Sequence, residues 1–76
     1  MLIQYYKLYL CDGNSVEAAD TEYIPVQMTL LSRYENAEED DVIRAQALDG
    51  STVCIPKKNI LYLRMTTINE TRRNVN

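Results

Sequence analysis

Histidine, tryptophan and phenylalanine are absent from this sequence of 76 residues, and glycine, proline and cysteine occur only twice each. Without histidine, the chain lacks the usual general base near neutral pH, and no Ser–His or Cys–His nucleophile pair can form. Zinc sites that use histidine are excluded, and two cysteines cannot make a four-thiolate zinc site. Two glycines are too few for a glycine-rich phosphate-binding loop. We therefore expect a protein that is not an enzyme and that holds no metal or cofactor.

Long hydrophobic runs are also missing. No apolar run approaches the ~18 residues of a transmembrane helix. The first seven residues lack the basic start and the small-residue cleavage site of a signal peptide. We therefore expect a cytoplasmic protein that does not contact a membrane. In that compartment Cys11 and Cys54 are expected as reduced, partly buried thiols, with one disulfide between them as the alternative.

The size and composition indicate one small globular domain. The chain has a mass of 8.8 kDa and is 46% hydrophobic and 25% charged. We expect residues 1–66 to form the domain and residues 67–76 to be a polar tail that frays. In a chain of this size, the free energy gained by hydrophobic burial only just balances the conformational entropy lost on folding. Association with a second copy buries more apolar surface, so we expect a homo-oligomer.

The first twenty residues have the pattern of a β-hairpin. Residues 2–11 are rich in tyrosine and branched aliphatic side chains, which strands favour, and both alternate faces are largely apolar. Asp12-Gly13 predicts a tight turn, after which residues 15–19 return. A small domain covers only one face of such a strand, so we expect the other face to be an oligomer interface. We assign this interface to Ile3, Tyr5 and Tyr9, with the opposite face as the alternative, which holds Leu2, Tyr6, Leu8 and Leu10.

The second half of the chain predicts another hairpin and a last strand. Asp49-Gly50 repeats the earlier turn pattern between two apolar segments. Residues 56–59 predict a turn or one helical turn, and residues 60–65 predict the last strand. Between the two hairpins, residues 23–33 are apolar, and Pro25 favours the start of a strand or an edge strand.

Two structures compete for residues 37–48. Asn36 followed by Glu39 resembles a capping box, more acidic residues follow, and Gly50 would cap the far end, all of which favours a helix. Against the helix, the side chains from Val42 to Leu48 alternate with a period of two and make a poor helical stripe. We therefore predict an all-β or β-rich fold, with an α+β fold containing a helix near residues 37–48 as the alternative.

Residues 41–63 contain a strand, an Asp-Gly turn, a strand that closes on Ile55-Pro56, one helical turn and a short strand from Ile60. This order resembles the C-terminal part of SH3-like and Sm-like small barrels. The resemblance covers a third of the chain and implies a small barrel of about five to six short antiparallel strands. No motif matching the RNA-contacting residues of the Sm family is present, so no binding residue is carried over from it.

Charge is distributed unevenly along the chain. Residues 1–56 carry three basic and ten acidic side chains, whereas residues 57–76 carry five basic and one acidic. The densest acidic segment is a candidate surface for a partner protein, and its residues are Glu35, Glu38, Glu39, Asp40 and Asp41. A basic set near the last predicted strand is a candidate anion or nucleotide site, with a tyrosine that could stack on a base. Its residues are Lys57, Lys58, Arg64 and Tyr62. The ordinary alternative for both sets is a solvated surface.

Two functions are consistent with these features. The first, which we favour, is a small oligomeric protein that regulates or inhibits a partner protein without catalysis, as compact accessory proteins of phages and bacteria do. The second is an oligomeric barrel that binds or sequesters a nucleotide or RNA through the basic set. Double-stranded DNA is not expected as a partner, because a net charge of −3 opposes phosphate binding.

Overall fold

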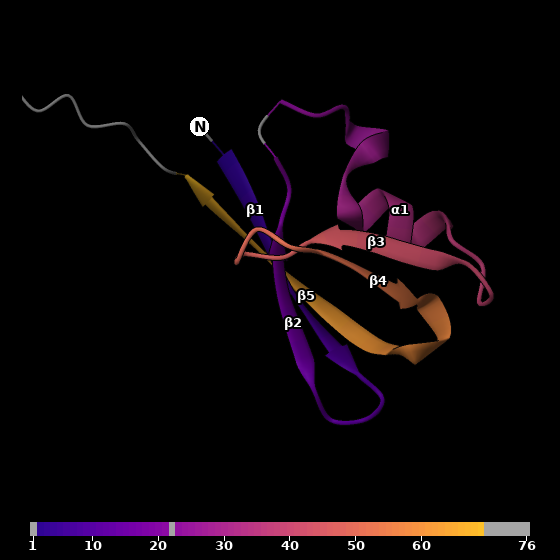
Figure 1. The fold of residues 1–76 in the computed structure, drawn as a ribbon. Coiled ribbons are helices and arrows are strands. Elements are labelled where there is room, and N and C mark those ends of the chain that lie inside the picture. The colour runs from indigo at the N-terminus through magenta and orange to yellow at the C-terminus, as the bar shows by residue number, and fades with distance from the viewer. Residues whose placement is uncertain (1, 22, 70–76) are drawn as a thin grey trace, which may run out of the picture.

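The structure, a computed structural model, describes residues 2–21 and 23–69. These residues form five strands, one short α-helix and two 3-10 turns (Figure 1). In chain order the elements are β1 (Leu2–Leu10), β2 (Ser15–Ala19), η1 (Val26–Met28), α1 (Leu30–Asn36), β3 (Val42–Gln46), β4 (Thr52–Pro56), η2 (Lys57–Asn59) and β5 (Ile60–Asn69). The β-rich fold class predicted from the sequence is therefore confirmed.

β1 is the central strand of a three-stranded antiparallel sheet with the order β2-β1-β5. In the middle of this sheet Lys7 pairs with Glu17 on β2 and with Arg64 on β5. Beyond Tyr9 a β-bulge shifts the register between β1 and β5. Neighbouring strands therefore pair with both edges of β1, and its inner face, which carries Tyr6 and Leu8, packs into the core.

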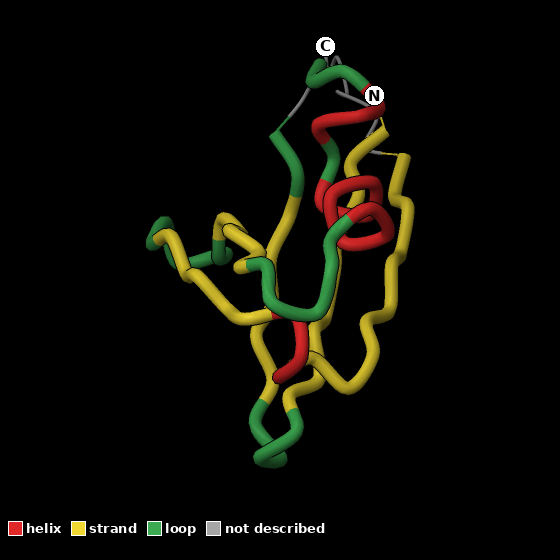
Figure 2. Tube along the Cα trace, turned by 90° about the vertical axis from the view of Figure 1, so that its right-hand side faces the viewer, coloured by secondary structure: helices red, strands yellow, loops and turns green. Residues whose placement is uncertain are grey.

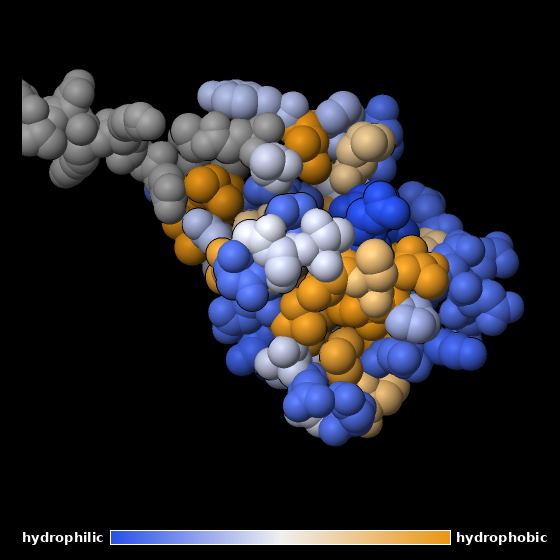
Figure 3. All heavy atoms as spheres, viewed as in Figure 1, coloured by the Kyte–Doolittle hydropathy of each residue, from blue (hydrophilic) through white to orange (hydrophobic). Residues whose placement is uncertain are grey.

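β3 and β4 form a separate two-stranded antiparallel sheet. A single bridge between Ala18 and Ala47 joins the end of this hairpin to β2. The described residues form no closed barrel, because one bridge does not continue the hydrogen-bond ladder from one sheet into the other. Apolar surface is visible in Figure 3 over the region where Figure 1 places β4. Half-buried Val16 of β2 and Val53 of β4 pack against the core.

The two predicted Asp-Gly hairpins are confirmed, and their turns have the same backbone geometry. In the first turn the Leu10 N–H donates across the hairpin at 2.8 Å, and the Gly13 N–H donates back to the Leu10 carbonyl at 3.0 Å. Ala47 and Gly50 make the same two bonds in the second turn, at 2.8 and 3.0 Å. Both glycines have a φ of 94°, a conformation that favours glycine.

Residues 37–48 contain β3, so the alternative of a helix in this segment is wrong. Ile43 and Ala45 are buried while their neighbours Val42 and Arg44 are exposed, which is the alternation that favoured a strand. The acidic residues that resembled a helix start lie in a loop instead. There, the carboxylate of Asp41 accepts a hydrogen bond from the Glu38 N–H at 2.8 Å.

Residues 23–33, where Pro25 favoured a strand, contain the 3-10 turn η1 and the start of the helix α1. Pro25 precedes the 3-10 turn η1, and Thr29 is the N-cap of α1, because its hydroxyl accepts from the Ser32 N–H at 3.3 Å. The carboxylate of Asp20 also accepts from the Leu30 N–H at 3.0 Å. The strand interpretation is therefore wrong, because these capping bonds and the burial of Leu30 favour a helix.

The core lies where the two sheets and α1 meet. Leu8 of β1 is fully buried, and Leu30 of α1 is 2% exposed. Figure 2 shows η1 and α1 toward the end of the molecule where the N-terminus lies, with η2 toward the opposite end. The buried side chains are Tyr6, Leu8, Ala18, Leu30, Ile43, Ala45, Ile55 and Ile60.

Three further expectations from the sequence concern the domain boundary, the cysteines and membrane-spanning helices. β5 ends at Asn69, beyond the expected domain boundary at residue 66, and residues 70–76 of the expected tail lie outside the described residues. Cys11 and Cys54 are free, as expected, but both are exposed rather than partly buried. Within the described part of the chain, no helix is long and apolar enough to cross a membrane.

Candidate functional site

One face of the β2-β1-β5 sheet points away from the core and carries aromatic, aliphatic and charged side chains. Because Tyr6 and Leu8 are buried on the inner face, strand alternation places the odd-numbered residues of β1 on the opposite face. The register adds their partners from β2 and β5 to that face. We call this surface the outer sheet face, and define it as Ile3, Tyr5, Lys7, Tyr9, Glu17, Tyr62, Arg64 and Ile68.

The three residues predicted to form an oligomer interface lie together on the outer sheet face. Ile3, Tyr5 and Tyr9 are all half-buried. Across from Ile3 on β5 is Ile68, which is 42% exposed, so an aliphatic pair lies at one end of the face.

Two tyrosine rings stack at the other end of the outer sheet face. The ring centroids of Tyr9 and Tyr62 are 4.6 Å apart, and the ring planes differ by 22°. Lys7 Nζ lies 5.4 Å from the centroid of the Tyr9 ring, within the range of a cation–π interaction. Because Tyr62 is 44% exposed, the stack presents aromatic surface to solvent beside a positive charge.

A hollow of about 370 Å³ extends the outer sheet face toward the second hairpin. Tyr5, Glu17 and Arg64 line it together with Leu48, which comes from the tip of the β3–β4 hairpin. The Leu48 N–H donates to the Glu17 carbonyl at 3.2 Å, and the Leu48 side chain is 53% exposed. The second hairpin therefore adds an exposed apolar side chain to this surface.

The structure divides the basic set predicted from the sequence between two places. Tyr62 and Arg64 lie on the outer sheet face, whereas Lys57 Nζ donates to the Ala37 carbonyl at 2.6 Å and lies 5.0 Å from the ring centroid of Tyr34. Lys58 is exposed on η2. Lys57 therefore ties η2 to the end of α1.

Lys7 takes the position beside Arg64 that the sequence analysis gave to the two lysines of η2. Lys7 and Arg64 are a cross-strand pair at the middle of the sheet. Only one signal in the sequence could have found Lys7, namely its alternation with Tyr5 and Tyr9 on one face of the first strand.

The acidic segment Glu35–Asp41 covers the last residues of α1 and the loop before β3, and its five carboxylate side chains are exposed. Asp41 closes this loop through its bond from Glu38 and through its carbonyl, which accepts from the Lys57 N–H at 2.8 Å.

A buried hydroxyl joins β1 to the start of α1, which the sequence analysis missed. The Tyr6 hydroxyl lies 2.6 Å from Asp20 Oδ2 and 3.0 Å from Gln4 Oε1, and it accepts from the Leu31 N–H at 3.4 Å. Burial and the hydrogen bond to Asp20 raise the pKa of the Tyr6 hydroxyl well above its usual value. Tyr6 therefore stays protonated and has a structural role.

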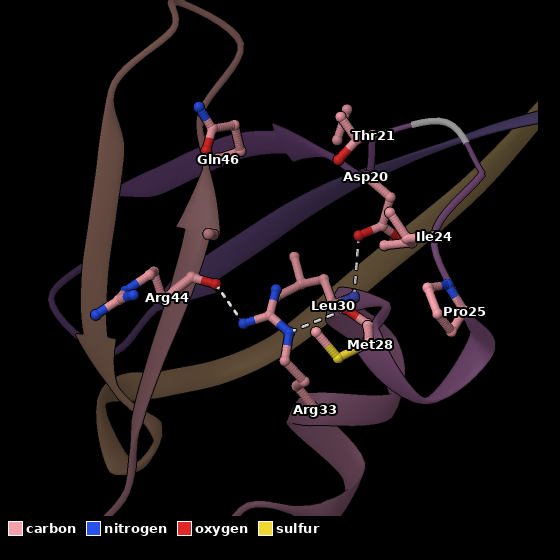
Figure 4. A pocket seen from close by; sticks show the side chains of 11 residues that line it. Asp20, Thr21, Ile24, Pro25, Met28, Leu30, Arg33, Arg44 and Gln46 are labelled. Atoms are coloured by element: carbon pink, nitrogen blue, oxygen red, sulfur yellow. Dashed lines mark hydrogen bonds between the residues drawn. The ribbon is translucent and has the colours of Figure 1, made fainter.

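A second cavity, of about 360 Å³, lies between α1, the segment that precedes it and β3 (Figure 4). Arg33 reaches across it, with Nε donating to the Met28 carbonyl at 3.2 Å and Nη1 to the Arg44 carbonyl at 2.7 Å. Arg44 also lines the cavity, but Figure 4 shows its side chain pointing away from Arg33. No local sequence pattern predicts this role of Arg33, because one of its two acceptors, the Arg44 carbonyl, belongs to β3.

The described residues contain no cluster of side chains able to hold a metal ion. Comparison with protein-family models, with curated proteins and with solved structures gave no match. The function of this chain is therefore inferred from its own residues and their geometry.

Proposed function

We propose that this chain is a non-catalytic binding protein that self-associates through its outer sheet face and regulates or inhibits a partner protein. The observation that supports this proposal is the apolar and aromatic character of a sheet face that no described element covers. Tyr62 and Ile68 are 44% and 42% exposed there. Tyrosine is enriched in protein interfaces, because its ring buries apolar area while its hydroxyl keeps a polar contact.

Two charges of this face, those of Glu17 and Arg64, favour a second copy of the chain as its occupant, whereas Lys7 would lie near the axis and face Lys7 of the second copy. Glu17 lies on β2, on one side of Lys7, and Arg64 lies on β5, on the other side. A two-fold axis parallel to β1 would place Glu17 of one copy over Arg64 of the second copy, and the reverse. Such a self-complementary arrangement is what a two-fold symmetric dimer requires.

The exposed acidic segment Glu35–Asp41 remains free in this dimer, because it lies beyond α1 and away from the outer sheet face. We assign it to the partner protein, whose matching surface would be basic. We place the protein in the cytoplasm, where the exposed thiols of Cys11 and Cys54 would stay reduced.

We also propose that the fold is an opened relative of the SH3-like and Sm-like small barrels. The bridge between Ala18 and Ala47 sets the two sheets in the order β5-β1-β2-β3-β4. The 3-10 turn η2 directly precedes the last strand. Both features support the proposal.

Light scattering on the purified chain tests the dimer. We expect a mass of at least twice 8.8 kDa for the wild-type protein. Tyr9→Glu should return the mass to that of the monomer, because it places a charge in the apolar interface. Tyr23→Glu is the matched control, because Tyr23 is 90% exposed and does not belong to the outer sheet face. A wild-type monomer at micromolar concentration contradicts the proposal.

A charge exchange tests the orientation of the two copies. Glu17→Arg and Arg64→Glu should each weaken the dimer, because each places like charges across the interface. The double variant should restore it, because the pairs are exchanged rather than lost. If both single variants dimerise like the wild type, then the two-fold axis parallel to β1 is wrong.

Binding of a nucleotide or single-stranded RNA is the second candidate function, and the Tyr9–Tyr62 stack beside Lys7 favours it. Aromatic rings next to cations are the common platform for unpaired bases. Oligouridylate should then quench tyrosine fluorescence, with affinity lost in Tyr62→Ala and kept in Lys58→Ala. If the oligonucleotide causes neither quenching nor a thermal shift, nucleotide and RNA binding are excluded, and protein binding remains as the candidate function.

A further inference from the structure

Arg33 is a cation that no acidic side chain neutralises within the described part of the chain. Two of its three guanidinium nitrogens donate to backbone carbonyls, those of Met28 and Arg44. These acceptors carry no net charge, so the positive charge of the guanidinium is not cancelled. Among residues 2–21 and 23–69, Nη2 has no hydrogen-bond partner. Arg33 is therefore fixed in place with donors still open.

The acidic residue in the same cavity is already in use. Asp20 Oδ1 accepts from the Leu30 N–H at 3.0 Å, and Oδ2 lies 2.6 Å from the Tyr6 hydroxyl. These two donors hold the carboxylate against the start of α1 and the core strand. Asp20 therefore serves the fold and makes no ion pair with Arg33, although its two donors are neutral and do not cancel the charge of its carboxylate.

The rest of the cavity is suited to the apolar part of a small molecule. Ile24, Met28 and Ala45 line it, and Thr21 and Gln46 add polar groups (Figure 4). Its volume of about 360 Å³ lies within the usual range for small-molecule sites. Mostly apolar walls with one fixed cation are the combination that such sites use to orient a ligand.

We infer that this cavity binds a small organic carboxylate. Arg33 receives the carboxylate through its open N–H groups, and the apolar wall contacts the body of the ligand. A guanidinium whose position is set by two carbonyls loses little conformational entropy when it binds an anion, which favours binding. The inference does not depend on the outer sheet face, which is a different surface.

Nuclear magnetic resonance with benzoate as the probe tests the site in the full-length chain. Benzoate should shift the Arg33 Nε–H and the side-chain amide of Gln46 in a saturable way, with a dissociation constant on the order of 1 mM for so small a probe. Benzamide has the same ring without the charge and should cause no saturable shift at these positions. Equal shifts with benzamide would overturn the assignment of a carboxylate.

Gln46→Glu is the variant that locates the binding. Gln46 is exposed, so the change should leave the fold intact, and the new carboxylate would compete for Arg33. We expect benzoate to bind at least tenfold more weakly to Gln46→Glu than to the wild type. Asn59→Asp is the matched control, because it makes the same amide-to-carboxylate change on η2, away from the cavity. It should bind benzoate like the wild type.

Two further results would overturn the inference. One is an affinity for benzoate that is the same in Gln46→Glu, Asn59→Asp and the wild type, because the binding would then lie elsewhere. The other is the absence of saturation below about 50 mM benzoate, a concentration far above the expected dissociation constant.

Discussion

Tyr5 and Tyr6 are neighbours of the same residue type with opposite environments. Tyr6 is 2% exposed, and its hydroxyl bonds to Asp20 and the start of α1. Tyr5 is half-buried on the outer sheet face, and its hydroxyl has no hydrogen-bond partner among the described residues. The period of two along the strand alone separates a buried, structural tyrosine from a tyrosine of the outer sheet face.

Removing the buried hydroxyl should destabilise the fold. Tyr6→Phe leaves one oxygen of Asp20 without its donor, and we expect it to lower the free energy of unfolding by about 2 kcal/mol. Tyr5→Phe is the control and should change it by less than about 0.5 kcal/mol. Urea unfolding followed by circular dichroism measures both values. Equal effects of the two substitutions would show that the bond to Asp20 contributes nothing.

The pKa of Tyr6 also predicts how stability depends on pH. This pKa is raised in the folded state, so the contribution of Tyr6 is complete below the ordinary tyrosine pKa of about 10. Above that pH the unfolded chain loses the proton while the folded chain keeps it, and stability falls. The free energy of unfolding should therefore fall more steeply above pH 10 in the wild type than in Tyr6→Phe. If the free energy of unfolding depends on pH in the same way in the wild type and in Tyr6→Phe, the expectation is contradicted.

At the scale of elements, the two hairpins are set by local chemistry. In each turn the aspartate carboxylate accepts from the N–H two residues later, at 2.9 Å from both Asn14 and Ser51. In the second turn, hydrogen bonds from the Ser51 side chain and backbone lower the pKa of Asp49. All of these contacts lie within a few residues, so the sequence pattern is sufficient to predict both turns.

Alanine in place of either turn glycine should destabilise the fold only through backbone strain. A Cβ at Gly13 or Gly50 would meet no atom within 4 Å, but both have a φ of 94°. We expect Gly13→Ala and Gly50→Ala each to lower the unfolding free energy by about 1–2 kcal/mol. Gly50→Asn should cost less than Gly50→Ala, because asparagine adopts positive φ more readily. Thermal unfolding distinguishes these variants, and an alanine variant as stable as the wild type would contradict the expectation.

At the scale of the whole molecule, dimerisation would compensate for the limited core of a small chain. Among the residues that the structure describes, the core contains eight buried side chains, of which two are alanines. A dimer buries additional apolar surface only when folded, so it stabilises the folded state by mass action.

The midpoint of thermal unfolding should therefore rise with protein concentration in the wild type. In Tyr9→Glu it should be independent of concentration, because the monomer unfolds alone. Tyr23→Glu should behave like the wild type. A wild-type midpoint that stays constant over a hundredfold range of concentration would contradict dimerisation of the folded state.

The sequence by itself determined the two hairpins, the strand at Val42–Gln46 and the last strand from Ile60, but not residues 23–33, where a strand was expected and η1 and α1 form. Each of these hairpins and strands depends on interactions between residues close in the chain, such as turn geometry and the alternation of buried and exposed side chains. The same alternation groups Ile3, Tyr5 and Tyr9 on one face, but only the burial of the opposite face in the structure shows that this face points outward.

Only the tertiary structure decided where α1 forms and which basic residues meet. α1 begins at Leu30, whose N–H donates a capping bond to Asp20, and the Lys57 side chain bonds to the Ala37 carbonyl and does not lie beside Arg64 on the outer sheet face. The cavity around Arg33 depends on a carbonyl of β3, eleven residues along the chain. These contacts join separate elements through side chains, and no periodic pattern or turn motif encodes such pairings, so they are established only when the sheets and the helix pack together.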